Sequence, residues 1–275
     1  MLDLPFTDVA STYEFLAPNL RDRESTEEFE FPVEYMFKDV PKAATDDPVE
    51  HTLALMDHHG IDRAMIGAGS DNQRRALREH PDRFLASIGV DANDGMEALR
   101  QIDRAAETTG LAGVALFPSG CNPPVPINDK RWYPVYAKCV ELDLPVFICV
   151  CVPGPRVPMA AQKVELLDEV CWFFPELRIV MRHGAEPWEE LAVKLMLKWP
   201  NLYYSTSAFA PKYYPQAIVD YANTRGADKV MYAGYFPMGL TLDRIFGELP
   251  DVPLKDEVWP KFLRHNAARV LGLDD

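Results

Sequence analysis

Residues 180–188, VMRHGAEPW, lead from an apolar run that begins at Leu177 into a polar cluster around a glycine. Apolar residues then recur at spacings of three and four, which predicts an amphipathic helix over residues 188–199. Two glutamates stand in its first turn, where negative charge favours the helix dipole. A strand, a tight turn and a helix are therefore expected in succession, with His183 at the carboxyl end of the strand. In parallel α/β folds, that end of the sheet holds ligands and catalytic groups.

The same succession repeats along the chain. Helix candidates, among them residues 72–80 and 255–271, alternate with apolar runs near residues 64–66, 84–90, 111–117, 145–152, 177–181, 202–206 and 229–234. These runs are apolar on both faces, as buried parallel strands are. With residues 1–4 as a first strand, eight β-then-α units in 275 residues predict an α/β (β/α)8 TIM barrel, a single domain over residues 1–275. A doubly wound sheet is the alternative, but no G-x-G-x-x-G or P-loop motif follows a strand.

A long segment, residues 8–46, separates the first predicted strand from the first predicted helix. It is rich in aromatic and acidic residues and shows little periodicity. Connections of this length without clear elements are uncommon in compact domains and tend to be functional. We interpret the segment as an arm or cap after the first strand, in which Tyr13 and Lys38 could close over a ligand. A purely structural cover of the barrel mouth is one alternative. A contact within a homodimer is the other, and we expect a homodimer.

The composition of the chain limits the kinds of partner and the cellular location that we expect. The net charge of −14 argues against nucleic acid or an anionic membrane as a partner, because both require a basic face. The start lacks the basic and apolar regions of a signal peptide, and no apolar run reaches the roughly 18 residues of a spanning helix. We expect a cytoplasmic protein. Its five cysteines include no C-x-x-C pair and predict neither disulfides nor a zinc site.

Several motifs carry a resemblance over roughly residues 47–272. They are PDRF (81–84), GLAGV (110–114), LPV (144–146), HG and PW (183–184 and 187–188), PNLY (200–203), NTRGADKV (223–230) and NAARVL (266–271). With these motifs the sequence resembles the amidohydrolase-2 branch of the metal-dependent hydrolases. The resemblance implies a TIM barrel and a hydrolase of amides or lactones, or a non-oxidative decarboxylase of carboxylated aromatics.

The metal ligands of that family match less well. Its members carry an H-x-H at the end of the first strand, where this chain has DLPFT (3–7). Cys149 stands near the family's histidine after the fifth strand, and Tyr235 stands where the family has an aspartate after the eighth; only His183 matches. A catalytic zinc requires about three protein ligands, so we expect no metal ligands and no cofactor. A divalent ion, such as zinc, held by an unrecognised set of ligands such as Asp3, Cys149 and His183 is the alternative.

His183 is the leading catalytic candidate, as a general acid or base near neutral pH. Tyr235 could donate a hydrogen bond to a carbonyl or oxyanion, or fill the former metal cavity. Cys149 could be a nucleophile with His183 as its base, and Cys151 alternates to the same face of its strand; packed core thiols are the alternative. Strand alternation predicts that Arg182 points away from His183.

Three further observations concern binding. Arg156 lies in the loop after the fifth predicted strand, where it could anchor a carboxylate or carbonyl. Glu186 follows His183 closely and could contact a substrate or simply begin the next helix. His58 and His59 are adjacent on a predicted helix and are expected to point in different directions.

These features favour an enzyme that acts on a small carboxylated or carbonyl-containing molecule. The resemblance suggests a hydrolase or a decarboxylase-like C–C lyase, and the altered ligand positions suggest that it is metal-independent, with His183 as acid or base. The alternative is a catalytically inactive barrel that binds a ligand or supports a partner enzyme.

Overall fold

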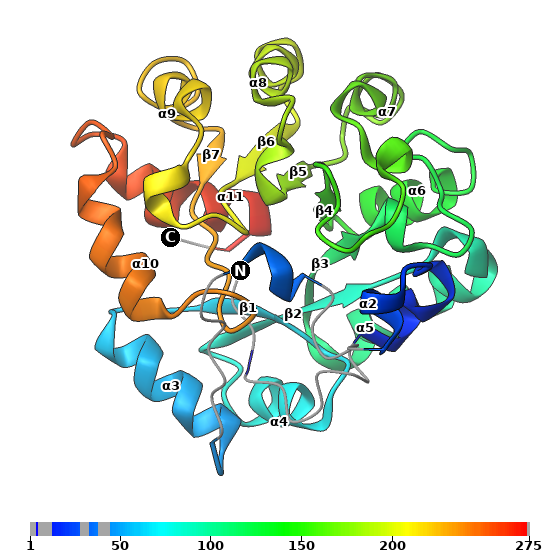
Figure 1. Ribbon diagram of the computed structural model, residues 1–275, viewed down its shortest axis with the longest axis horizontal. Coiled ribbons are helices and arrows are strands. Elements are labelled where there is room, and N and C mark those ends of the chain that lie inside the picture. Colours follow the sequence, from blue (N-terminus) through cyan, green and yellow to red (C-terminus); the bar gives the residue numbers. More distant parts are fainter. Residues whose placement is uncertain (1–3, 5–12, 28–32, 38–44, 274–275) are drawn as a thin grey trace.

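The computed structural model describes residues 4, 13–27, 33–37 and 45–273. Seven parallel strands form one sheet in chain order, and the sheet curls so that helices surround its convex face (Figure 1). The strands are β1 (Ala64–Gly67), β2 (Phe84–Gly89), β3 (Leu111–Leu116), β4 (Val146–Cys149), β5 (Ile179–Arg182), β6 (Leu202–Ser205) and β7 (Val230–Met231). Their carboxyl ends therefore lie along one edge, as the sequence predicts.

Helices lead from each strand to the next. They are α3 (Pro48–His58), α4 (Asp71–Glu79), α5 (Met96–Thr109), α6 (Tyr133–Glu141), α7 (Leu167–Phe173), α8 (Glu189–Lys198), α9 (Gln216–Ala222), α10 (Leu242–Glu248) and α11 (Asn266–Leu271). Side-chain caps fix several starts. Ser70 and Gln73 form a capping box at α4, and Asp47 accepts two backbone N–H bonds at the start of α3.

The strands separate two packed regions. Residues on the convex face pack against the helices in one large core. Met65, Phe147, Val180 and Met231 pack instead with Val270 of α11 in a second cluster. Because side chains alternate along a strand, this second cluster defines the concave face.

The concave face continues to the carboxyl ends of β4 and β5. Phe147 pairs with Val180 in the parallel register, and Cys149 pairs with Arg182 two residues further on. Cys149 and Arg182 therefore point into the concavity of the sheet.

The structure leaves the first predicted strand and the closure of the barrel largely undescribed. Of the predicted first strand only Leu4 is described, and it is buried in the core. Within the described ranges β1 and β7 lie at the two edges of the sheet and do not pair. The parallel α/β sheet is confirmed, whereas an arm inserted after a first strand stays a prediction. No helix in the described part of the chain is both long and apolar enough to cross a membrane.

Described parts of the predicted arm lie against loops at the carboxyl ends of the strands. They are the 3-10 helices η1 (Glu14–Asn19) and η2 (Glu34–Met36) and the short helix α2 (Arg23–Glu27). Asn19 donates to the backbone oxygens of Gly120 and Cys121, in the loop after β3. The Tyr35 hydroxyl donates to the carbonyl of Gly154, after β4, at 2.6 Å.

Candidate functional site

The chain turns sharply where β5 ends. His183 has φ of 63° and Ala185 has φ of 56°, both in the left-handed region that favours glycine, and Gly184 between them has φ of 80°. Non-glycine residues in this region carry strain of about 1–3 kcal/mol each, and such residues concentrate at functional sites. The buried Ser207 hydroxyl accepts the backbone N–H of His183 at 3.0 Å and lies 3.4 Å from its Nδ1. Ser207 thus holds His183 in place, a role that the sequence pattern did not indicate.

Aromatic rings cover the imidazole. The ring of Tyr235 meets the ring of His183 edge to face, with centroids 5.7 Å apart. Phe37 stacks on the ring of Tyr235, with centroids 5.6 Å apart. Two residues predicted as catalytic are therefore in contact, and a residue from the arm segment lies over them.

Arg182 lies in the same site, contrary to the prediction from strand alternation. It points into the concavity beside Cys149. Its charge adds to the effect of burial in lowering the pKa of His183, and it opposes the effect of burial, which raises the pKa of Tyr235 and Cys149. The alternation fails because His183 leaves the strand with a positive φ. The Nε of Arg182 is buried, and no hydrogen-bond acceptor within the described ranges contacts it. A buried donor without a partner is destabilising and suits an incoming anion.

Burial sets the protonation states. It lowers the pKa of His183 well below the ordinary 6.5, and the charge of Arg182 lowers that pKa further. It raises the pKa of Tyr235, although Arg182 opposes the shift. At neutral pH the site therefore combines a neutral imidazole, a protonated phenol and a guanidinium cation.

The two thiols are protonated as well. Cys149 and Cys151 are buried, and burial raises the pKa of both, which disfavours the thiolate that a nucleophile requires. Gln162 donates to the Cys151 carbonyl at 2.9 Å and contacts its sulfur at 3.6 Å. This environment is that of packed core thiols, the alternative considered from the sequence.

The predicted binding residues are dispersed. Arg156 pairs with Asp22 at 2.7 Å and Glu24 at 2.9 Å and lies over the ring of Tyr35, so it binds the arm segment. The Tyr13 hydroxyl donates to the Met238 sulfur at 3.0 Å.

Of two further predicted residues, one is exposed and the other is not described. Glu186 is exposed, just before α8. Lys38 lies outside the described residues.

The donors around His183 suit a hard divalent ion poorly. Those that the structure describes are an imidazole, two buried thiols and a phenol, and the Arg182 guanidinium lies among them. Manganese and magnesium prefer carboxylate, carbonyl and water oxygens, and a fixed positive charge opposes a second cation. The described part of this site therefore does not match the ligand set of such an ion.

A curled parallel sheet with its polar cluster at the carboxyl ends of the strands defines a protein of the TIM-barrel class. Within that class, the chain belongs to the amidohydrolase family, whose model matches residues 15–273. A segment of 106 residues is 29% identical in sequence to 2-keto-4-carboxy-3-hexenedioate hydratase from Sphingobium. That match spans 34% of this chain and only 31% of the relative's length.

Solved structures share the fold over nearly the whole chain. An uncharacterized TIM-barrel protein from Bordetella bronchiseptica superposes with a TM-score of 0.75 and 22% identity, over 98% of this chain and 96% of that one. A variant of 5-carboxyvanillate decarboxylase from Novosphingobium aromaticivorans, with a TM-score of 0.67 and 17% identity, covers 99% of this chain and 95% of its own.

This decarboxylase was solved with bound manganese and 3-methoxy-4-hydroxy-5-nitrobenzoic acid. The expectation from the sequence that the protein has no cofactor is therefore contradicted, since structural neighbours in the family hold a metal.

Proposed function

We propose that this protein is a small-molecule hydrolase or lyase that acts on a carboxylated substrate, with Arg182 binding the carboxylate and His183 serving as a base. The observation that carries the proposal is the buried Nε of Arg182, which has no partner among the described residues and lies beside the strained His183. The family match and the names of the relatives support it, because both names describe carboxylated substrates.

Arg182 supplies the binding energy. A guanidinium binds a carboxylate with two parallel hydrogen bonds, and hydrogen bonds to charged groups contribute about 1.5–3 kcal/mol. A substrate carboxylate would give the buried Nε the acceptor that it lacks among the described residues. Strand β5 fixes the backbone of Arg182, so the carboxylate would be held next to His183.

His183 and Tyr235 divide the proton chemistry. A neutral imidazole accepts a proton, so His183 can remove one from a water molecule that attacks a carbonyl or a carbon–carbon double bond. The protonated phenol of Tyr235 can donate a hydrogen bond to the oxygen on which charge develops. This combination favours hydrolysis or hydration.

Decarboxylation is the second candidate, and the likeness to a decarboxylase favours it. There the carbon that loses CO2 takes up a proton, which a neutral imidazole cannot supply. The phenol of Tyr235, whose ring contacts that of His183 with centroids 5.7 Å apart, would then be the proton donor.

The test is a panel of carboxylated substrates, namely unsaturated 2-keto acids, carboxylated phenols and lactones, each paired with its methyl ester. Arg182→Met should raise KM for a carboxylated substrate by about 10–100-fold and leave the ester unchanged, and Arg182→Lys should recover part of the loss. His183→Gln should lower kcat by about 100-fold or more. Arg131→Met, which removes a surface arginine paired with Asp129, is the matched control.

Two outcomes would contradict the proposal. Equal losses for acid and ester substrates in Arg182→Met would show that Arg182 only supports the fold. Ligand binding without turnover, unchanged in His183→Gln, would make the protein a binding barrel. Each assay is run with and without added manganese, so that a metal requirement is not mistaken for inactivity.

A further inference from the structure

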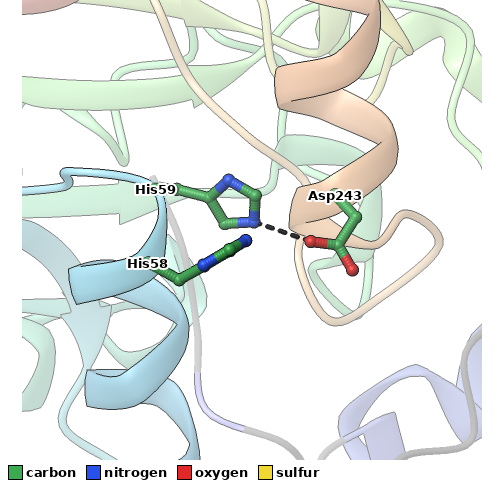
Figure 2. Close-up of side chains that lie close together, drawn as sticks. All are labelled: His58, His59 and Asp243. Carbon is green, nitrogen blue, oxygen red and sulfur yellow. Dashed lines mark hydrogen bonds and ion pairs between the residues drawn. The ribbon is translucent and has the colours of Figure 1, made fainter.

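Two helices from opposite ends of the sequence bring three metal-ligand side chains together. His58 ends α3 and His59 follows it, while Asp243 lies in the first turn of α10. Figure 2 shows that the three side chains converge on one point between the helices. The expectation that the two histidines point in different directions is wrong, because their ring centroids lie only 4.7 Å apart.

The spacing of the donor atoms suits a single ion. Nε2 of His59 lies 2.9 Å from Oδ1 of Asp243, and one donor atom from each of the three residues lies within 4.8 Å of the others. An ion bonded at about 2.0–2.2 Å holds neighbouring ligand atoms roughly 3–3.5 Å apart. The His59–Asp243 separation is close to this spacing, and the exposed His58 ring lies near enough to join the set by turning toward the other two groups.

His59 is fixed before any ion arrives. Its ring stacks on Phe246 of α10, with centroids 4.8 Å apart and planes at 16°, and its side chain is only 10% exposed. Within the described ranges no lysine or arginine forms an ion pair with Asp243, so no side-chain cation competes there. A preorganised imidazole beside a carboxylate that no described lysine or arginine neutralises is favourable for metal binding.

We propose that His58, His59 and Asp243 bind one divalent transition-metal ion, and that this ion joins α3 to α10. Two imidazoles and a carboxylate form the ligand set of many zinc sites, with a water molecule in the fourth position. Zn2+ is the first candidate, because the set contains two nitrogen donors and is not the all-oxygen set that magnesium, calcium or manganese favours.

The role of this site is structural. His59 stands just ahead of the amino end of β1, whereas His183 follows the carboxyl end of β5, so the two sites lie at different ends of the strands. Helix α3 leads into β1 and α10 follows β7, the two strands at the edges of the described sheet. An ion between residues 184 positions apart closes a long loop and stabilises the folded state through chain entropy.

The experiment measures thermal unfolding of tag-free, metal-stripped full-length protein as ZnCl2 is added, together with calorimetric titration. Wild-type protein should bind about one ion, with a Tm increase of roughly 5 °C or more at 100-fold excess over Kd. Asp243→Asn and His58→Ala should each weaken zinc binding by more than about 10-fold. Both residues are exposed, so the variants should fold. His80→Ala, whose imidazole lies 3.9 Å from Glu50, is the matched control and should behave as wild type.

Visible absorption of the Co2+-substituted protein gives a second measurement that does not depend on stability. Wild-type protein should show the d–d bands of a four- or five-coordinate ion, and Asp243→Asn should lose them. An unchanged wild-type Tm with no bound zinc would overturn the proposal. So would zinc binding that survives in both variants, or that is lost equally in the His80 control.

Discussion

Replacing Ser207 with alanine tests whether this hydroxyl holds the strained turn at His183. Ser207 Oγ accepts the buried backbone N–H of His183 at 3.0 Å, and Ser207 itself has no exposed surface. The variant would leave that N–H without an acceptor, which costs about 1–3 kcal/mol. For a protein of this size the loss corresponds to a Tm decrease of roughly 2–5 °C.

The assay is urea unfolding at neutral pH, followed by circular dichroism, with Ser205→Ala as the matched control. Ser205 is equally buried, but its hydroxyl donates to the carbonyl of Met181 at 3.0 Å. The control leaves no donor unpaired and should lose only about 0.5–1 kcal/mol. Equal free energies of unfolding for the two variants would refute the reasoning about His183.

Two further predictions concern the same turn. Because the pKa of folded His183 lies well below the ordinary 6.5, the unfolded chain takes up a proton first, and stability should fall by up to about 1.4 kcal/mol per pH unit as the pH drops below about 6.5. Urea unfolding at pH 5.5 and 7.5 should show a smaller change in the free energy of unfolding with pH in His183→Gln than in the wild-type protein. An unchanged pH dependence would contradict the lowered pKa of His183. Gly184→Ala should cost about 2–4 kcal/mol, because φ is 80° and the added Cβ meets the Phe209 ring, whereas Gly247→Ala, in open space on α10, should be neutral or slightly stabilising. Similar Tm values for the two alanine variants would exclude strain at Gly184.

Periodicity predicted most of the described elements correctly. Apolar runs marked the seven strands because buried parallel strands need apolar residues on both faces. Helices with clear caps, such as α4 after Ser70, began within a residue of the prediction. Boundaries failed where the helix changes type: the sequence predicted one helix over 255–271, whereas a π-helical turn over 261–265 precedes α11. Helix α10 was missed, since its seven residues span only about two turns and show too little periodicity.

The residues of the candidate site were predicted less completely than the secondary structure. Sequence position placed His183 at the end of a strand, and the family motifs placed Tyr235 after the last one; both are in the site. Arg182 was assigned to the wrong face, because alternation holds only while the chain stays extended. The loop position of Arg156 predicted that it binds a substrate carboxylate. Instead it pairs with two carboxylates of the chain itself, which lie 134 and 132 residues away in the sequence and could not be foreseen from local spacing.

The amino-acid sequence by itself therefore determined the order of elements, the parallel sheet and the edge at which His183 lies, since these depend on the local spacing of apolar residues. Tertiary structure alone decided which polar groups meet there. Contacts such as Phe37 with Tyr235, or His59 with Asp243, join residues far apart in the chain. Burial, which shifts the pKa of His183 and leaves the Nε of Arg182 unpaired among described residues, arises only when those segments pack together.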